Sequence, residues 1–226
     1  MEVIARIHND FTTKFGIPRQ SGLVDSLLSE IIFEPEYRNP EALRGIEGFS
    51  YLWLIWEFSE AIHEKWSPTV RPPRLGGNKR MGVFATRSPF RPNNLGLSSV
   101  KLINIRHDNV FGDILVVGGA DLMDGTPIYD IKPYLTTTDC HPDAKGGFVA
   151  QNPQHLLDVN ISDEMTKKLP PEKIKTLIDI IAQDPRPAYQ CDNERTYGFF
   201  FGENQIKFKV TDNCAEITSI EKIRKR

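Results

Sequence analysis

The basic side chains of this sequence gather in one segment. Residues 65–107 hold nine Lys or Arg residues and no Asp or Glu, which leaves 19 basic against 30 acidic residues in the rest of the chain. The formal net charge of the whole chain is only −2. Positive charge concentrated in this way is typical of a protein that binds a phosphate group or a polyanion. The segment is also rich in Gly, Pro and Asn, which favours shaped binding loops over a merely solvated surface.

Within this segment, residues 82–93 carry the side chains best suited to binding an anion. Two prolines stiffen the backbone there, and Arg87 and Arg91 can each present forked donors to a phosphate or a carboxylate. Taken alone, a loop of Arg and Pro is more often a surface turn than a site. The Gly- and Pro-containing loop at residues 15–22 has a single arginine, and its residues alone also favour a surface turn over a binding site.

Residues 121–134 combine three carboxylates, one lysine and two tyrosines. The run Asp-Gly-Thr-Pro at residues 124–127 is a turn signature. Asp130 and Lys132 follow it two residues apart, so an extended chain places both side chains on one face. A carboxylate beside an ammonium group at the exit of a turn is a candidate reactive site. The alternative is an ion pair that only fixes the strand.

Strand-like patterns dominate the first two thirds of the chain. We therefore expect the loops described above to connect strands, which position them. Many short strands separated by turn residues predict a mainly β fold, a barrel or a sandwich, and argue against a doubly wound sheet. No Gly-x-Gly-x-x-Gly run follows a strand. We predict that residues 51–58 form a strand buried on both faces, because the run is mostly apolar. The other predicted strands are residues 3–7, 81–86, 97–105 and 110–117.

The last third has a different pattern. Residues 136–162 resemble a loop, and Pro171 then stands at a plausible first position of a helix whose apolar residues recur at helical spacing before Pro185. Two aromatic and β-branched runs, 197–201 and 206–210, predict a hairpin. We therefore predict a single-sheet, barrel-like catalytic domain at residues 1–142, a linker at 143–160 and a small α+β domain at 161–226.

Several classes of protein are disfavoured. The longest apolar run, residues 51–56, is far too short to span a membrane, and the first residues resemble no secretion signal. The three cysteines (Cys140, Cys191 and Cys214) and the five histidines (His8, His63, His107, His141 and His155) show no spacing typical of a metal site. The sequence therefore predicts a cytoplasmic protein with free thiols and without a bound metal.

Five motifs in the same order resemble the TsaA-like family, also called the TrmO family. They are residues 82–93, Pro18-Arg19-Gln20, the run Arg-Pro-Pro-Arg-Leu-Gly-Gly-Asn from Arg71, residues 124–134, and Asp-Pro-Arg-Pro-Ala-Tyr at 184–189. The resemblance covers nearly the whole chain. It implies a homodimer with a single barrel-like sheet that uses S-adenosylmethionine. The reaction it implies is methylation of N6 of threonylcarbamoyl-adenosine at position 37 of tRNA, with tRNA-Thr as the expected tRNA.

The resemblance implies the cofactor contacts, whereas the proton acceptor and the phosphate contacts are inferred from the residue types. Ser59-Glu60 stands where many relatives have His-Gln, and Glu60 retains acceptors for ribose hydroxyls. Asp130 is the candidate acceptor for the proton of N6. Phosphates of the tRNA are expected to contact Arg71, Arg74, Lys79, Arg80 and Arg91. The implied cofactor contacts are Pro18, Arg19, Gln20, Ser59, Glu60, Arg87, Leu97, Asp124, Gly125, Thr126 and Pro127.

Two alternatives stay open at this point. A non-catalytic RNA-binding module would keep the basic segment and need no cofactor pocket. A methyltransferase with another acceptor would keep the pocket, since no motif in the sequence reads a threonylcarbamoyl group.

Overall fold

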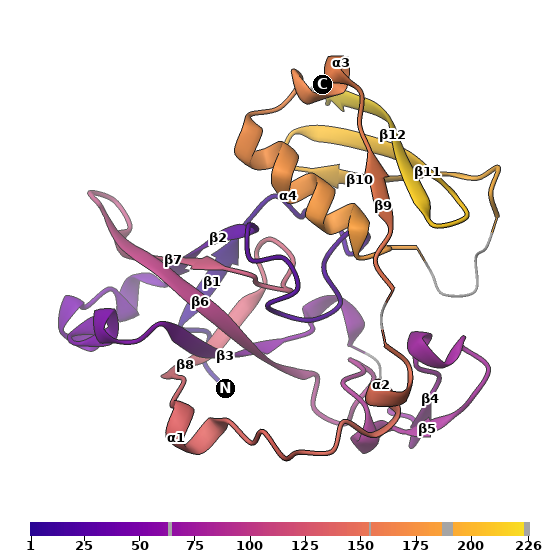
Figure 1. Cartoon of the computed structure of the whole chain (residues 1–226). Coiled ribbons are helices and arrows are strands. Elements are labelled where there is room, and N and C mark those ends of the chain that lie inside the picture. Colours follow the sequence, from indigo (N-terminus) through magenta and orange to yellow (C-terminus); the bar gives the residue numbers. More distant parts are fainter. Residues whose placement is uncertain (63–64, 154, 187–191, 224–226) are drawn as a thin grey trace.

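A computed structural model describes residues 1–62, 65–153, 155–186 and 192–223. Six strands form one antiparallel sheet in the order β1-β2-β7-β6-β3-β8, and β8 also pairs with β1, so the sheet closes on itself (Figure 1). The strands are β1 (Ala5–His8), β2 (Leu28–Phe33), β3 (Tyr51–Glu57), β6 (Leu95–Asp108), β7 (Gly112–Gly118) and β8 (Pro127–Pro133).

The interior of this sheet is filled by alternate residues of each strand. Along β3, Leu52, Leu54 and Trp56 are buried, whereas Tyr51, Trp53 and Ile55 on the other face are only partly covered or exposed. The prediction that this strand is buried on both faces is therefore wrong. A sheet that closes on itself has one interior, so its outer face stays partly in contact with solvent.

The basic segment leaves the sheet between β3 and β6. It forms a short ribbon of β4 (Thr69–Val70) and β5 (Met81–Gly82), which Figure 1 shows apart from the main sheet. The strand predicted at residues 81–86 is correct only for Met81 and Gly82, because the chain turns into a 3-10 helix at Val83–Ala85. Thr86 closes that turn by donating its backbone N–H to the Val83 carbonyl at 3.1 Å.

Short 3-10 and α-helical turns connect the remaining parts of the N-terminal region. The 3-10 turns are η1 (Pro35–Tyr37), η2 (Pro40–Leu43), η3 (Ile46–Gly48), η4 (Ser59–Ala61), η5 (Pro73–Leu75) and η6 (Val83–Ala85). The short α-helices after β8 are α1 (Thr136–Asp139) and α2 (Gly147–Gln151). No helix within the described ranges is long and apolar enough to cross a membrane.

The C-terminal region is a second sheet in the order β10-β11-β12-β9, with one long helix beside it. Its elements are β9 (Asp158–Asn160), α3 (Asp163–Thr166), α4 (Pro171–Ala182), β10 (Thr196–Phe201), β11 (Asn204–Thr211) and β12 (Cys214–Lys222). Pro171 begins α4, and β10 and β11 form the expected hairpin. The predicted fold class, mainly β with a small α+β region, is confirmed. The domain boundaries stay a prediction, and β9 lies inside the range assigned to the linker.

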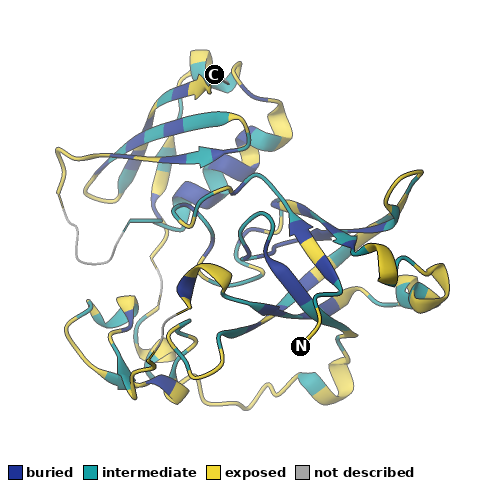
Figure 2. Ribbon diagram, turned by 180° about the vertical axis from the view of Figure 1, so that it is seen from behind, coloured by how far each residue is buried: buried dark blue, intermediate teal, exposed yellow. Residues whose placement is uncertain are grey.

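The β1–β2 loop shares the hydrophobic core of the C-terminal region, whereas the interior of the first sheet forms a cluster of its own. Phe11, Val24 and Leu27 belong to the loop between β1 and β2, yet they are buried in the cluster formed by α4 and the C-terminal sheet. The ring of Phe11 lies 5.8 Å from that of Phe201 and 6.3 Å from that of Phe199. Figure 2 shows buried residues along the inner faces of both sheets and of α4. The β1–β2 loop, which carries residues 18–20, is thereby fixed at both regions.

We expect Phe11→Ala to destabilise both regions together by about 3–5 kcal/mol, because it removes a fully buried ring from the shared core. Urea unfolding followed by tryptophan fluorescence reports the first sheet, and amide exchange of α4 reports the second. Phe84→Ala is the control, since Phe84 is 73% exposed. Loss of stability in only one of the two regions would contradict a shared core.

Candidate functional site

Two of the segments expected to bind the cofactor meet in the structure. Arg87 Nη1 donates to Gln20 Oε1 at 2.5 Å, which joins the β1–β2 loop to the loop after η6, although the two residues lie 67 positions apart. Arg19 contacts the segment after α4 instead. Its Nη2 donates to the main-chain carbonyls of Asp184 at 3.3 Å and of Arg186 at 2.7 Å. Neighbouring side chains of one loop therefore contact the loop after η6 and the C-terminal region. Pro18, which precedes Arg19 in this loop, is buried.

The Arg87 loop is held rigid by its own side chains. Arg91 Nη1 donates to the carbonyls of Thr86 at 2.9 Å and Ser88 at 3.3 Å. Asn94 Nδ2 donates to Pro89 at 2.8 Å and to the Ala61 carbonyl at 3.0 Å, at the end of η4. The η4 turn carries Ser59 and Glu60, which are both exposed. The structure thus ties Ser59 and Glu60 to the Arg87 loop, and it assigns Arg91 a bracing role within that loop.

The turn at residues 124–127 is fixed to the end of β1. Asp124 Oδ1 accepts the backbone N–H of Asn9 at 3.1 Å and lies 3.1 Å from His8 Nδ1. Arg6 Nη1 donates to the Gly125 carbonyl at 3.1 Å. Gly125 has φ +76°, and no atom lies within 4 Å of the position a Cβ would take. A ligand can therefore approach the backbone at Gly125, whereas Thr126 and Pro127 are buried.

A row of three residues crosses the outer face of the first sheet. Leu97 on β6 pairs with Ile55 on β3, and Ile55 pairs with Asp130 on β8. Residues opposite one another in antiparallel strands point to the same face, so Asp130 lies about 10 Å from Leu97, two strand spacings away. Leu97 is 57% exposed. The expected ion pair also forms, with Lys132 Nζ 2.8 Å from Asp130 Oδ2.

One hydrogen-bonded network beneath this site was not predicted from the sequence. Trp56 Nε1 donates to Ser98 Oγ at 3.0 Å, and Ser98 Oγ donates to Asp121 Oδ1 at 2.6 Å. Burial raises the pKa of Asp121, while the bond from Ser98, backbone N–H groups that include Ser21, and the charge of Arg87 each lower it. The sequence signal that could have revealed this network is Asp121 itself, a carboxylate that stands soon after the apolar strand β7. The network joins the first sheet to the loop that carries Gln20.

The predicted phosphate-binding residues fall into two groups. Arg71 and Lys79 are exposed, and neither forms an ion pair within the described part of the chain. Arg74 Nη1 donates to the Asn152 carbonyl at 3.4 Å, and Arg80 Nη1 donates to Thr69 Oγ1 at 2.9 Å. The neutral partner of Arg80 leaves its positive charge in place, so Arg71, Lys79 and Arg80 keep their electrostatic attraction for an anion.

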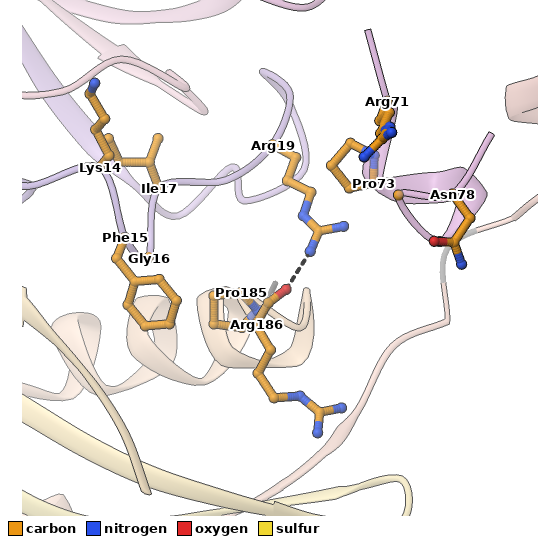
Figure 3. Close-up of a pocket in the computed structure, with 12 residues that line it drawn as sticks. Lys14, Phe15, Gly16, Ile17, Arg19, Arg71, Pro73, Asn78, Pro185 and Arg186 are labelled. Atoms are coloured by element: carbon orange, nitrogen blue, oxygen red, sulfur yellow. Dashed lines mark hydrogen bonds between the residues drawn. The ribbon is translucent and has the colours of Figure 1, made fainter. Parts of the chain in front are cut away.

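A cavity of about 610 Å³ opens between the two regions, beside Arg19 (Figure 3). Its walls come from the β1–β2 loop, the loop around η5 and the segment after α4. No group of three or more potential metal ligands occurs among the residues that the structure describes. Pro187, Ala188 and Tyr189 of the last sequence motif lie outside the described residues, as do Cys191 and His63.

This arrangement defines a class of protein: a closed antiparallel sheet whose loops form a basic, partly enclosed binding site. Two family models match the chain, the tRNA-methyltransferase O N-terminal domain at residues 6–140 and the TrmO C-terminal domain at residues 154–223. The chain belongs to the TrmO family. The predictions of this family and of a methyltransferase are confirmed, and a non-catalytic module is disfavoured.

Similar proteins carry matching names. The chain is 41% identical to the tRNA (adenine(37)-N6)-methyltransferase of Escherichia coli K12, over 97% of each chain. It is 39% identical to a putative S-adenosylmethionine-dependent methyltransferase, RcsF, of Pseudomonas aeruginosa, over 86% of this chain and 85% of that one. The crystal structure of TrmO from Pseudomonas aeruginosa aligns with a TM-score of 0.77 at 28% identity, over 97% of this chain and 98% of the other.

The buried network gives a stability prediction. We expect Ser98→Ala to cost about 1–3 kcal/mol, because it leaves the Trp56 indole N–H without its partner in a buried place and removes a donor from Asp121. Ser99→Ala is the matched control, since Ser99 is the next residue and points to the outer face. Urea unfolding measures both variants, and equal costs would contradict the network.

The same variant should be sensitive to pH. The Ser98 hydroxyl stabilises the ionised form of Asp121, so its loss raises the pKa of Asp121 further. A folded-state pKa raised above the unfolded value makes stability fall as pH rises through that pKa. The cost of Ser98→Ala is therefore expected to be larger at pH 7 than near pH 4.

Proposed function

We propose that this protein transfers a methyl group from S-adenosylmethionine to N6 of threonylcarbamoyl-adenosine at position 37 of tRNA, with tRNA-Thr among its substrates. The product is N6-methyl-threonylcarbamoyl-adenosine. The observation that carries the proposal is the bond between Arg87 and Gln20. It joins two segments that resemble cofactor motifs of the family and that no local pattern would bring together.

The groups around this bond fit S-adenosylmethionine. An exposed guanidinium at Arg87 suits the carboxylate of the ligand, the exposed Leu97 suits an apolar ring face, and the open backbone at Gly125 allows close approach. Glu60 adds carboxylate acceptors for ribose hydroxyls. When bound, S-adenosylmethionine supplies an electrophilic methyl group. The protein residues hold and align the reactants, and alignment alone can supply much of the rate of such a displacement.

Asp130 is the proposed acceptor of the proton that leaves N6. It lies in the outer row with Leu97, and its carboxylate is 43% exposed and within reach of solvent. Lys132 holds one carboxylate oxygen, and the backbone N–H of Ile131 donates to the other at 2.9 Å. These two bonds fix the carboxylate in an extended strand, where it can accept a proton directly or through one water.

We propose that Arg74, Lys79 and Arg80 hold phosphates of the tRNA, with the rigid Arg91 loop beside them. The homodimer and the cytoplasmic location stay predictions. Large apolar side chains stand exposed along the basic segment and next to it, and a second copy of the chain would cover such a surface. They are Trp66, Phe84, Phe90 and Leu97.

The reaction is tested with purified protein, S-adenosylmethionine and tRNA that carries threonylcarbamoyl-adenosine, with the product nucleosides measured by mass spectrometry. We expect methylated product from the wild type and a KM for S-adenosylmethionine raised at least about tenfold in Arg87→Ala, through loss of a charge-assisted hydrogen bond. Arg106→Ala is the control, because Arg106 pairs with Glu30 away from the site. No product from the wild type would refute the function, and an unchanged KM would refute the contact.

For Asp130, we expect Asp130→Asn to slow single-turnover methylation by roughly 10²-fold with little change in cofactor or tRNA affinity, because the amide cannot accept the proton. Stability should change by less than about 1 kcal/mol, since the ion pair is exposed. Lys132→Met removes the same ion pair and keeps the carboxylate. Equal rates in the two variants would make Asp130 a structural partner of Lys132 only.

A further inference from the structure

Among the described residues, the cavity beside Arg19 is lined by cations and by no carboxylate. Four of its lining residues are basic, namely Lys14, Arg19, Arg71 and Arg186. Phe15, Ile17 and the glycines around η5 supply the rest of the surface, together with Asn78 and two prolines. Figure 3 shows Arg19 between the wall that carries Arg71 and the wall that carries Arg186. A site of this composition selects an anion with a small apolar part.

Three of these cations, Lys14, Arg19 and Arg71, form no ion pair with a carboxylate of the described residues. Arg186 is neutralised by Asp184, with Nε–Oδ1 and Nη2–Oδ2 distances of 2.7 and 2.9 Å. Arg19 bonds only to main-chain carbonyls, and Arg71 forms no ion pair in the described ranges. Partial desolvation lowers the pKa of Arg19, Asp184 raises it, and the like charge of Arg74 lowers it again. A bound anion would relieve the repulsion between these arginines.

The cavity also lies next to the proposed reaction site. Arg19 precedes Gln20, whose side chain holds Arg87 on the cofactor side of the loop. In threonylcarbamoyl-adenosine, the carboxylate carbon is separated from N6 by four covalent bonds, about 5 Å in an extended conformation. A group that binds this carboxylate must therefore stand close to the point of methyl transfer. Of the five residues that the sequence predicts to contact tRNA phosphates, only Arg71 lines the cavity.

We propose that this cavity binds the carboxylate of the threonylcarbamoyl group, through the guanidinium groups of Arg19 and Arg71, and so selects the modified adenosine over plain adenosine. The inference rests on the proposed function. The shared chemistry is an anionic oxygen bound by arginine, which a tRNA phosphate also offers. The partly enclosed position between the two regions favours the carboxylate, as does the β1–β2 loop, which carries both Arg19 in the cavity and Gln20 beside Arg87.

The test compares two tRNAs of one sequence, with threonylcarbamoyl-adenosine or unmodified adenosine at position 37, in equilibrium binding with saturating S-adenosylhomocysteine. We expect the wild type to prefer the modified tRNA. Arg71→Gln should reduce this preference about tenfold and change the affinity for unmodified tRNA little. Arg80→Gln is the matched control: it lies in the same segment outside the cavity and should weaken both tRNAs equally.

A competition arm separates the two anions. Free threonylcarbamoyl-adenosine nucleoside carries the carboxylate and no phosphate, so it should compete against the modified tRNA for the wild type and about tenfold less well for Arg71→Gln. If Arg71→Gln lost the same affinity for both tRNAs, or if the wild type showed no preference for the modified tRNA, the inference would be overturned in favour of a phosphate site. Methylation of the modified tRNA by that same wild-type protein would then leave the proposed function standing.

Discussion

Phe11 packs into the hydrophobic core of the C-terminal region although it belongs to the loop that leaves β1 of the first sheet. With Val24 and Leu27 it anchors both ends of that loop, so residues 14–20 between them have little freedom to move. The cofactor segment, the cavity wall and the contact to Arg186 all lie on this stretch. The relative placement of the two regions and the shape of the site therefore depend on this apolar packing, supported by polar contacts such as the ion pair between Lys173 and Asp10.

Charge is arranged so that the basic segment keeps its attraction for anions. Arg80 and Arg91 bond to a hydroxyl and to main-chain carbonyls, which brace the loops without neutralising the guanidinium groups. The acidic side chains form most of their ion pairs outside the segment, as between Arg6 and Glu34. An exception is Arg106 near its end, which pairs with Glu30. Because neutral acceptors fix the loops, rigidity and positive potential coexist in the same segment, and both favour association with RNA.

Methyl transfer from a sulfonium centre requires alignment more than covalent participation by the protein. The site matches that requirement, because most of its proposed contact residues are held in place by hydrogen bonds or ion pairs to other residues of the chain. Asp121 and Ser98 sit under the loop that carries Gln20, and Asn94 ties η4 to the Arg87 loop. Lys132 and the Ile131 amide fix Asp130 in the same way. Each proposed contact thus has a structural partner that determines its direction.

The sequence by itself determined the family, the mainly β class, the helix that begins at Pro171, the C-terminal hairpin and the segregation of charge, because these follow from local patterns and motifs. Only the tertiary structure decided that Tyr51–Glu57 has one buried face and that Gln20 meets Arg87. It also decided that Leu97, Ile55 and Asp130 share a row, and that Asp121 accepts a hydrogen bond from Ser98 beneath the site. These facts depend on strand register and on which loops pack together. Periodicity along a chain reports which faces of an element are apolar, and it carries no information on partners dozens of residues away.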